Sequence, residues 1–310
     1  MSYQLKPDET LGDGVRRLIR GQIENAICAS KAKQNGKGSP VHETRKHLKK
    51  ARAALALVRG EVKKKTWKRE DRCLAQVGQM ISDVRDAEVR LETVRQLRGF
   101  MRGKKRSFVE TEELLAFELD SFLAAFSEWP QEAEARLGET LERLRDWPLR
   151  KLDCKRLRRN VQRTYKRGRQ DLEAAIEHMT TETLHAFRKR AKQLSYQMRI
   201  LRPLAPTVFG ELNDELKTIG ECLGQLHDLA FVSQRLWSFG GTEKQGDRIL
   251  SALIAVRTDE LRSTAIALGE RFYAERPRQF ARRIARYFSE WETARVRCFA
   301  PNEKRVTALN

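Results

Sequence analysis

The chain has 310 residues, of which 40% are hydrophobic, and its 62 Lys and Arg exceed its 42 Asp and Glu, giving a formal charge of +20. This composition excludes a disordered basic tail, because the apolar residues suffice for one large core or two modest ones. The excess of cations favours a polyanionic partner, which is a nucleic acid, an anionic membrane surface or another polyanion.

Helices are predicted along almost the whole chain, because apolar residues recur with a period near 3.6 and Gly and Pro gather at a few breaks. No run of alternating β-branched residues indicates a strand. The predicted helices span residues 10–32, 41–60, 67–102, 107–128, 131–146, 150–178, 181–202, 207–239, 244–272 and 277–297. The two long helices at 67–102 and 207–239 are expected to bend.

One basic helix is written twice, as VHETRKHLKKARAALALV at 41–58 and as LHAFRKRAKQLSYQMRIL at 184–201. The aligned basic pairs are His42 and His185, Arg45 and Arg188, Lys46 and Lys189, and Lys49 and Lys192. On a helical wheel each copy has an apolar arc opposite a basic arc whose centre holds no acid. A charged arc is ordinarily a solvated face, but such faces mix signs so that Glu and Lys pair. The duplicated cationic arc therefore predicts a polyanionic ligand.

The repeat extends to the neighbouring helices. Asp86 in the helix after the first copy aligns with Asp228 in the helix after the second. Upstream, VRRLIRGQIE at 15–24 aligns with LRRNVQRTYK at 157–166, and residues 154–169 contain eight Lys or Arg and no acid. This pattern predicts an all-α fold of two four-helix bundles related by an internal pseudo-twofold axis, with the basic stripes facing each other across a shared groove.

The two halves are predicted at 10–149 and 150–300, within one domain over 1–310. Five scattered cysteines without a CxxC pair favour neither a disulfide framework nor a zinc site, and Cys28 and Cys222 are expected to fill the core. No signal-peptide core and no stretch of about eighteen apolar residues is found, so a cytoplasmic protein without a membrane partner is expected.

The pattern hydrophobe-His-x-x-Arg-Lys-x-x-Lys, followed some forty residues later by Leu/Val-x-Asp, occurs in both halves. It resembles the conserved histidine α-helical domain (CHAD) family, from about Leu11 to about Arg297, and we expect a stand-alone member. The resemblance implies two four-helix bundles around a basic central cavity that binds inorganic polyphosphate, and an association with polyphosphate granules and their proteins. Carried over by position, it implies the binding residues His42, Arg45, Lys46, Lys49, Arg52, His185, Arg188, Lys189 and Lys192.

The predicted site has an outer part. Basic side chains of the preceding helices are added to the binding set: Arg16, Arg17, Arg20, Arg158, Arg159, Arg163 and Lys166. Four further residues are predicted to orient the cations: Asp86, Asp228, Arg85 and Tyr196. The two aspartates could instead hold Mg²⁺ together with phosphate, but no metal site and no cofactor is expected.

The chemistry of these side chains suits a phosphate polymer. Polyphosphate has about one charge per unit and no bases, so only charge density and shape can be recognised. Arg makes forked contacts to phosphate oxygens, whereas Lys supplies point charges. His42 and His185, crowded by cations, should protonate more easily once phosphate is bound, which predicts tighter binding at mildly acidic pH. Alternatively, each histidine is structural and bonds a carbonyl or an aspartate.

No catalytic motif is present: the sequence lacks GxxxxGK[ST], HExxH, CxxC and GxSxG, so we predict no catalytic residues and no enzyme. Three alternatives stay open. A nucleic-acid binder has the right charge, but with 7% aromatic residues it is poorly equipped for base stacking, so we expect only non-specific binding. The others are a polyphosphate-processing phosphohydrolase and an adaptor for granule proteins.

Overall fold

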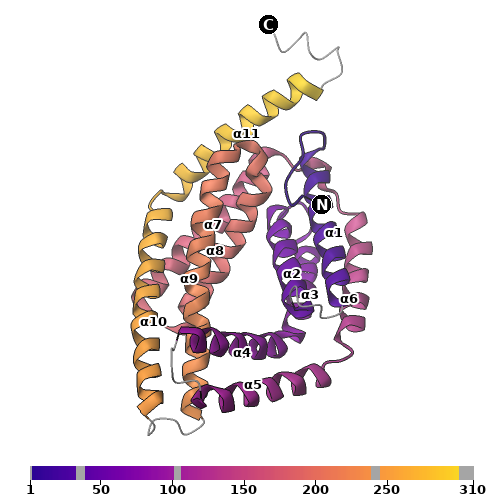
Figure 1. The fold of residues 1–310 in the computed structure, drawn as a ribbon. Helices are drawn as coiled ribbons and strands as arrows, with labels where there is room; N and C mark the ends of the chain where they lie inside the picture. The colour runs from indigo at the N-terminus through magenta and orange to yellow at the C-terminus, as the bar shows by residue number, and fades with distance from the viewer. Residues whose placement is uncertain (1, 33–38, 101–105, 239–244, 300–310) are drawn as a thin grey trace.

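The computed structural model describes residues 2–32, 39–100, 106–238 and 245–299. Within these ranges the chain forms eleven α-helices and two short 3₁₀ helices, and no strand (Figure 1). The all-helical prediction is confirmed. The main difference from the ten predicted helices is at 67–102, where the structure has two helices in place of one.

The first group of helices packs side by side, on the right of Figure 1. It consists of α1 (Leu11–Ser30), α2 (Pro40–Leu57), α3 (Lys64–Met80) and α6 (Trp129–Arg145). α1 contacts both α2 and α6, and α3 contacts α2 and α6. The core between these helices includes the fully buried Val15, Ile19, Ile23, Leu55 and Leu137. Apolar residues at helical spacing give each helix one apolar face, and these faces pack against each other.

The helix predicted at 67–102 breaks at Ile81, where α3 ends and α4 (Ser82–Phe100) begins. The buried Ser82 explains the break: its hydroxyl donates to the carbonyl oxygen of Gln79 at 2.7 Å, a local bond that competes with the helical ladder. α4 and α5 (Arg106–Ala125) then pack together and cross the bottom of the molecule, where α4 contacts α9 (Figure 1).

The second group lies on the left of Figure 1. Its elements are α7 (Cys154–His178), α8 (Thr181–Leu201), η2 (Arg202–Leu204), α9 (Pro206–Ser238), α10 (Gln245–Phe272) and α11 (Pro277–Phe299). The short η1 (Leu149–Lys151) precedes α7 and packs on α1 of the first group. α8 packs between α7 and α9, and α9 packs on α10. The buried ring of Tyr165 stacks on Phe280 with centroids 4.0 Å apart, and its hydroxyl donates to the carbonyl oxygen of Glu275 at 2.9 Å. α11 is thereby fastened to α7.

The two groups are joined through α2, which contacts α7 and α8. The buried Asn160 Nδ2 of α7 donates to the carbonyl oxygen of Leu57 at 2.8 Å, and the buried Gln197 Nε2 of α8 donates to that of Ala53 at 3.3 Å. Because both amides are shielded from water, losing a partner would leave a buried polar group unsatisfied. This junction therefore fixes the basic helices α2 and α8 relative to each other.

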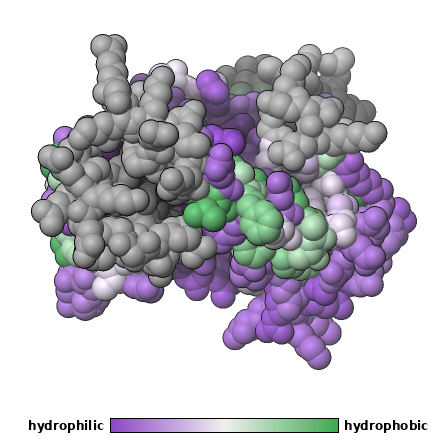
Figure 2. All heavy atoms as spheres, turned by 60° about the horizontal axis from the view of Figure 1, so that its bottom comes forward, coloured by the Kyte–Doolittle hydropathy of each residue, from purple (hydrophilic) through white to green (hydrophobic). Residues whose placement is uncertain are grey.

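Apolar side chains gather on the face of the molecule that lies at the bottom in Figure 1 and comes forward in Figure 2. On α5, which crosses this end, Leu114 is 50% and Phe117 is 74% exposed. Among the residues described, no helix has the length and hydropathy needed to cross a membrane. Cys28, Cys73, Cys154 and Cys222 are free thiols, and Cys28 is exposed, so the prediction that it fills the core is wrong.

Candidate functional site

The two histidine-bearing helices begin at side-chain caps. In α2, Ser39 Oγ accepts the backbone N–H of His42 at 3.2 Å, and in α8, Thr180 Oγ1 accepts that of Thr183 at 3.2 Å. The caps fix where each helix starts and so the direction in which its basic face points. The opposite faces bury Val41, Leu48, Ala51 and Leu55 in α2, and Phe187, Ala191, Leu194 and Met198 in α8.

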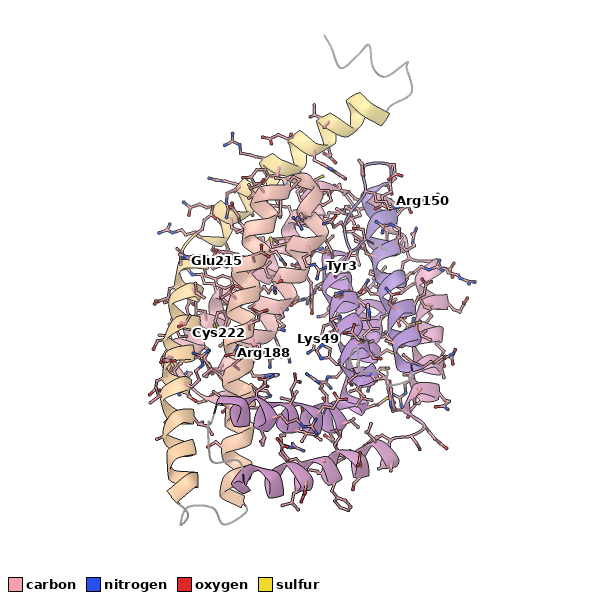
Figure 3. The ribbon with its side chains drawn as sticks, viewed as in Figure 1. Tyr3, Lys49, Arg150, Arg188, Glu215 and Cys222 are labelled. Atoms are coloured by element: carbon pink, nitrogen blue, oxygen red, sulfur yellow. The ribbon has the colours of Figure 1, made fainter. Side chains whose placement is uncertain are left out.

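Cations from the two halves face each other between α2 and α8. Lys49 and Arg188 project from opposite sides into the space between the halves (Figure 3). Lys49 keeps access to solvent in this space, but the protein on both sides limits the hydration of its ammonium group. Burial there, together with the charges of Arg45, Arg188, Lys192 and Arg85, lowers the pKa of Lys49 to about 7. Both halves therefore contribute to one cationic site.

We call this site the central cluster. Its members are His42, Arg45, Lys49, Arg85, His185, Arg188, Lys192 and His227. Every other member interacts electrostatically with Lys49 or Arg85. These two cations of the first half in turn interact with Arg188 and Lys192 of the second half.

Arg45 is held in place by α3 and α4. Its Nη1 donates to the carbonyl oxygen of Gly78 at 2.6 Å, in the last turn of α3, where the helix dipole favours a cation. Asp86 of α4 interacts electrostatically with Arg45, and burial raises the pKa of Asp86 despite that cation. Asp86 is therefore close enough to attract the guanidinium of Arg45.

Two glycines of α9 make room for the cations of α8. A Cβ atom at Gly224 would lie 2.8 Å from Nη2 of Arg188, and one at Gly220 would lie 3.3 Å from Cγ of Lys192. Asp228, one turn further along α9, interacts electrostatically with both cations. Close approach of the α9 backbone therefore positions Arg188 and Lys192.

The histidines of the central cluster are neutral at pH 7. Burial and then the charge of Arg85 lower the pKa of His42 to about 4. Burial and then His227, whose ring centroid lies 5.2 Å away, lower the pKa of His185 to about 4. These directions agree with the expectation that crowding by cations hinders protonation of both rings when no anion is bound.

Sequence reasoning underestimated Arg85 and missed His227. Arg85 was predicted only to orient other cations, but its charge acts directly on Lys49, His42 and Arg188. His227 occupies the position equivalent to Arg85 in the second half, beside Asp228 as Arg85 is beside Asp86. The aligned repeat contained this signal.

Comparison with known proteins identifies the family. The model of the CHAD domain matches residues 21–237, which is more than half of the chain. The chain belongs to the CHAD family. The crystal structure of the CHAD domain from the plant Ricinus communis is similar in fold, with a TM-score of 0.57 and 16% identity over 93% of this chain and 95% of that one. Curated proteins give no match.

Several predicted binding residues of this CHAD domain have carboxylate partners. Lys46 pairs with Glu43 one turn before it on α2. Arg52 makes a forked contact with Asp71 of α3, with Nε to Oδ1 at 2.8 Å and Nη2 to Oδ2 at 3.3 Å. Both cations are neutralised at the edge of the basic face and are less available than Lys49 to an added anion.

The three predicted arginines of α1 also have local partners. Arg16 pairs with Asp13 at 2.8 Å, Arg17 with Glu9 at 2.6 Å and Arg20 with Glu24 at 3.6 Å. None of them is among the charges that act on Lys49. α1 therefore supports α2 in this CHAD domain, and its arginines lie apart from the central cluster.

The predicted residues of α7 and α8 divide into two places. The charge of Lys189 acts on His185, and Tyr196 lies within electrostatic reach of Arg188, so both adjoin the central cluster. By contrast, Arg159 and Arg163 line a separate pocket at the end of α2. Arg158 is half-buried and Lys166 is exposed on the same helix, α7. In the described part of the CHAD domain, no group of three or more His, Cys, Asp or Glu could hold a metal ion.

Proposed function

We propose that this CHAD domain binds inorganic polyphosphate at the central cluster. The observation that carries the proposal is the convergence of cations from both halves around Lys49, whose pKa is lowered first by burial and then by four like charges. Such crowding opposes folding unless a polyanion offsets it. CHAD domains are associated with polyphosphate binding in general, which supports this choice of polyanion.

The geometry favours a flexible phosphate polymer over a nucleic acid. Arg45 and Arg188 offer forked donors, and Lys49 and Lys192 offer point charges. The central cluster contains no Phe, Tyr or Trp side chain as a large platform for a base. We propose further that the protein binds polyphosphate without cleaving it, in the cytoplasm at polyphosphate granules. The halves at 10–149 and 150–300 are proposed to be related by a pseudo-twofold axis through the cluster, which the equivalent Arg45–Asp86 and Arg188–Asp228 pairs support.

The test replaces the symmetric core of the site. The variant His42→Ala, Arg45→Ala, His185→Ala, Arg188→Ala is expected to bind long-chain polyphosphate about 100-fold more weakly, roughly tenfold for each arginine, because each loses charge-assisted bonds to phosphate. Calorimetry at fixed salt measures the affinities, with duplex DNA at equal phosphate concentration as a control. Equal affinities of wild type and variant, or equal binding of both polymers, would reject the site. Phosphate release in the same mixtures would reject binding without cleavage.

Replacing Gly224 should separate binding from stability. An alanine Cβ there would lie 2.8 Å from Nη2 of Arg188, so this flexible guanidinium must move, and we expect polyphosphate affinity to fall about three- to tenfold. Stability should be unchanged or higher by up to about 1 kcal/mol, because alanine is the better helix former. Gly138→Ala is the matched control: it lies inside α6, and a Cβ there meets nothing within 4 Å. An equal affinity of the Gly224→Ala and Gly138→Ala proteins would contradict the placement of Arg188 in the site.

Binding should be tighter at lower pH. A bound polyanion favours the charged form of Lys49 and returns its pKa from about 7 toward the ordinary 10.5. Between these values the complex holds more protons than the free protein, so affinity falls as pH rises, by up to about tenfold per pH unit for a fully linked group. His42 and His185 extend the trend between about pH 4 and 6.5 by the same reasoning.

Calorimetry in two buffers of different ionisation enthalpy measures the proton uptake directly. Lys49→Met should reduce the uptake between pH 7 and pH 9 and leave that near pH 5, whereas the double change His42→Ala, His185→Ala should do the reverse. An affinity that stays constant from pH 6 to pH 9 would show that Lys49 does not contact the ligand.

A further inference from the structure

A second basic site lies outside the central cluster, where the end of α2 meets η1 and the start of α7. It is a pocket of about 520 Å³, within the range of about 300–1,000 Å³ that is common for small ligands. Its lining residues are Arg59, Gly60, Glu61, Pro148, Lys151, Arg156, Arg159, Asn160 and Arg163. Arg59 lies two residues beyond the end of α2, and Lys49 lies eight residues before that end, which is about 12 Å along the helix.

Most of the charge in this pocket has no counterion within it. The single carboxylate, Glu61, is 6% exposed and pairs with Arg156 at 3.1 Å. Arg163 donates to the neutral Oδ1 of Asn160 at 2.6 Å, while Lys151 and Arg159 are exposed. Four cations, Arg59, Lys151, Arg159 and Arg163, therefore remain without a carboxylate at ion-pair distance among the described residues.

The arginines of the pocket are close enough to repel each other. Burial, followed by the charges of Arg59, Arg167 and Arg159, lowers the pKa of Arg163. The guanidinium of Arg59 is held over the ring of Trp67, 5.0 Å from its centroid, and so cannot move away freely. Gly60, with a φ of 99°, adopts the left-handed conformation that lets the chain turn with Arg59 and Glu61 both in the wall.

The chemistry of the lining restricts the ligand. Four of its five cations are arginines, which suit forked contacts to phosphate oxygens. No aromatic ring lines the pocket and its one apolar side chain is Pro148, so the pocket lacks an aromatic platform for a nucleobase. The lining therefore suits a ligand that consists only of phosphoryl groups.

We propose that this pocket binds a short condensed phosphate of two to three phosphoryl units, either as a free oligophosphate or as the end of a polyphosphate chain. This inference rests on the proposed function in one respect, the choice of condensed phosphate as the class of ligand. The pocket differs from the central cluster in position, and its lining contains no histidine.

The experiment titrates tripolyphosphate into wild type and into Lys151→Ala, Arg159→Ala. Both side chains are exposed and make no described side-chain hydrogen bond, so the variant should fold, which circular dichroism verifies. Its affinity should fall about tenfold or more, because two cationic contacts are lost. The matched control Arg150→Ala, Lys155→Ala removes two exposed charges beside the pocket but not in it, and should weaken binding about threefold at most through the general field.

Capped polymers distinguish the two sources of the ligand. If the pocket takes chain ends, wild type will prefer long-chain polyphosphate with free ends over the same polymer with esterified ends, and the pocket variant will lose that preference. If it takes free oligophosphate, tripolyphosphate will bind while capping has no effect. Tripolyphosphate affinities that fall equally in the pocket variant and its control would overturn the inference.

The proposed function is tested separately in the same series. The quadruple variant at His42, Arg45, His185 and Arg188 should keep tripolyphosphate binding in the pocket while losing the long polymer. If the quadruple variant loses tripolyphosphate binding and the pocket variant keeps it, the short ligand binds at the central cluster. That outcome would reject the second site and leave the proposed function standing.

Discussion

The affinity of the protein for long-chain polyphosphate should fall roughly a thousandfold between 50 and 200 mM salt. Six cations lie in or beside the central cluster: Arg45, Lys49, Arg85, Arg188, Lys189 and Lys192. Release of about six counterions, at about 0.7–0.9 each, gives a slope of roughly −4.2 to −5.4 in a plot of log affinity against log salt concentration. A fourfold rise in salt then lowers the affinity by about three powers of ten.

The variants make this measurement specific to the site. The quadruple variant lacks Arg45 and Arg188, so its slope should be shallower by about two, because each phosphate-contacting cation contributes about one. Arg16→Ala, Arg20→Ala removes two arginines of α1 that pair with Asp13 and Glu24, and should leave the slope nearly unchanged. A wild-type slope near −1, or the same slope in all three proteins, would mean that binding does not involve the central cluster.

Arg143→Ala should lower the free energy of unfolding by about 3 kcal/mol. The side chain of Glu70 on α3 is fully buried and accepts two bonds from Arg143 of α6, with Nε and Nη2 both at 2.9 Å. Removing one partner of a buried pair leaves an uncompensated charge, which costs about 3–5 kcal/mol. The lower figure applies because Arg69 Nε still donates to Glu70 at 2.7 Å.

Chemical denaturation of variant and wild type measures this loss. Burial raises the pKa of Glu70, but the bonds from Arg143 and Arg69 outweigh it and hold that pKa below the ordinary value. The stabilisation is thus present above the ordinary pKa and is lost as pH falls through the lower folded value, so the two proteins should converge in acid. Arg145→Ala, which removes an exposed pair with Glu142, should cost at most about 0.5 kcal/mol. If both substitutions cost the same, the pair does not stabilise the contact of α3 with α6.

Much of the fold could be predicted from the sequence because its period of apolar residues is regular. The helices around Arg45 and Arg188 begin and end close to their predicted bounds, since Ser39 and Thr180 are ordinary caps. A bend in the helix at 67–102 was expected, but a complete break at Ile81 was not, because no Pro lies there and Gly78 is still inside α3. Its cause is a buried serine whose hydroxyl bonds the preceding turn, and a serine inside a helical pattern does not by itself indicate a break.

The site was predictable up to the point where other helices decide which cations are neutralised. A helical wheel places Arg52 with Lys49, but only the packing of α3 brings Asp71 to Arg52. Similarly, no pattern shows that Glu9 reaches Arg17 from the segment before α1. The reverse holds for His227, which the alignment of the two halves places opposite Arg85 and which belongs to the central cluster.

The facing cations of α2 and α8 also affect the lifetime of the protein. Without an anion their repulsion favours opening of the halves, and a bound polymer removes it, so the folded fraction grows with ligand concentration. Proteases degrade the opened form, and its population sets the rate of loss when opening is fast. If the central cluster binds polyphosphate as proposed, the polymer should therefore slow proteolysis of this protein in proportion to its concentration.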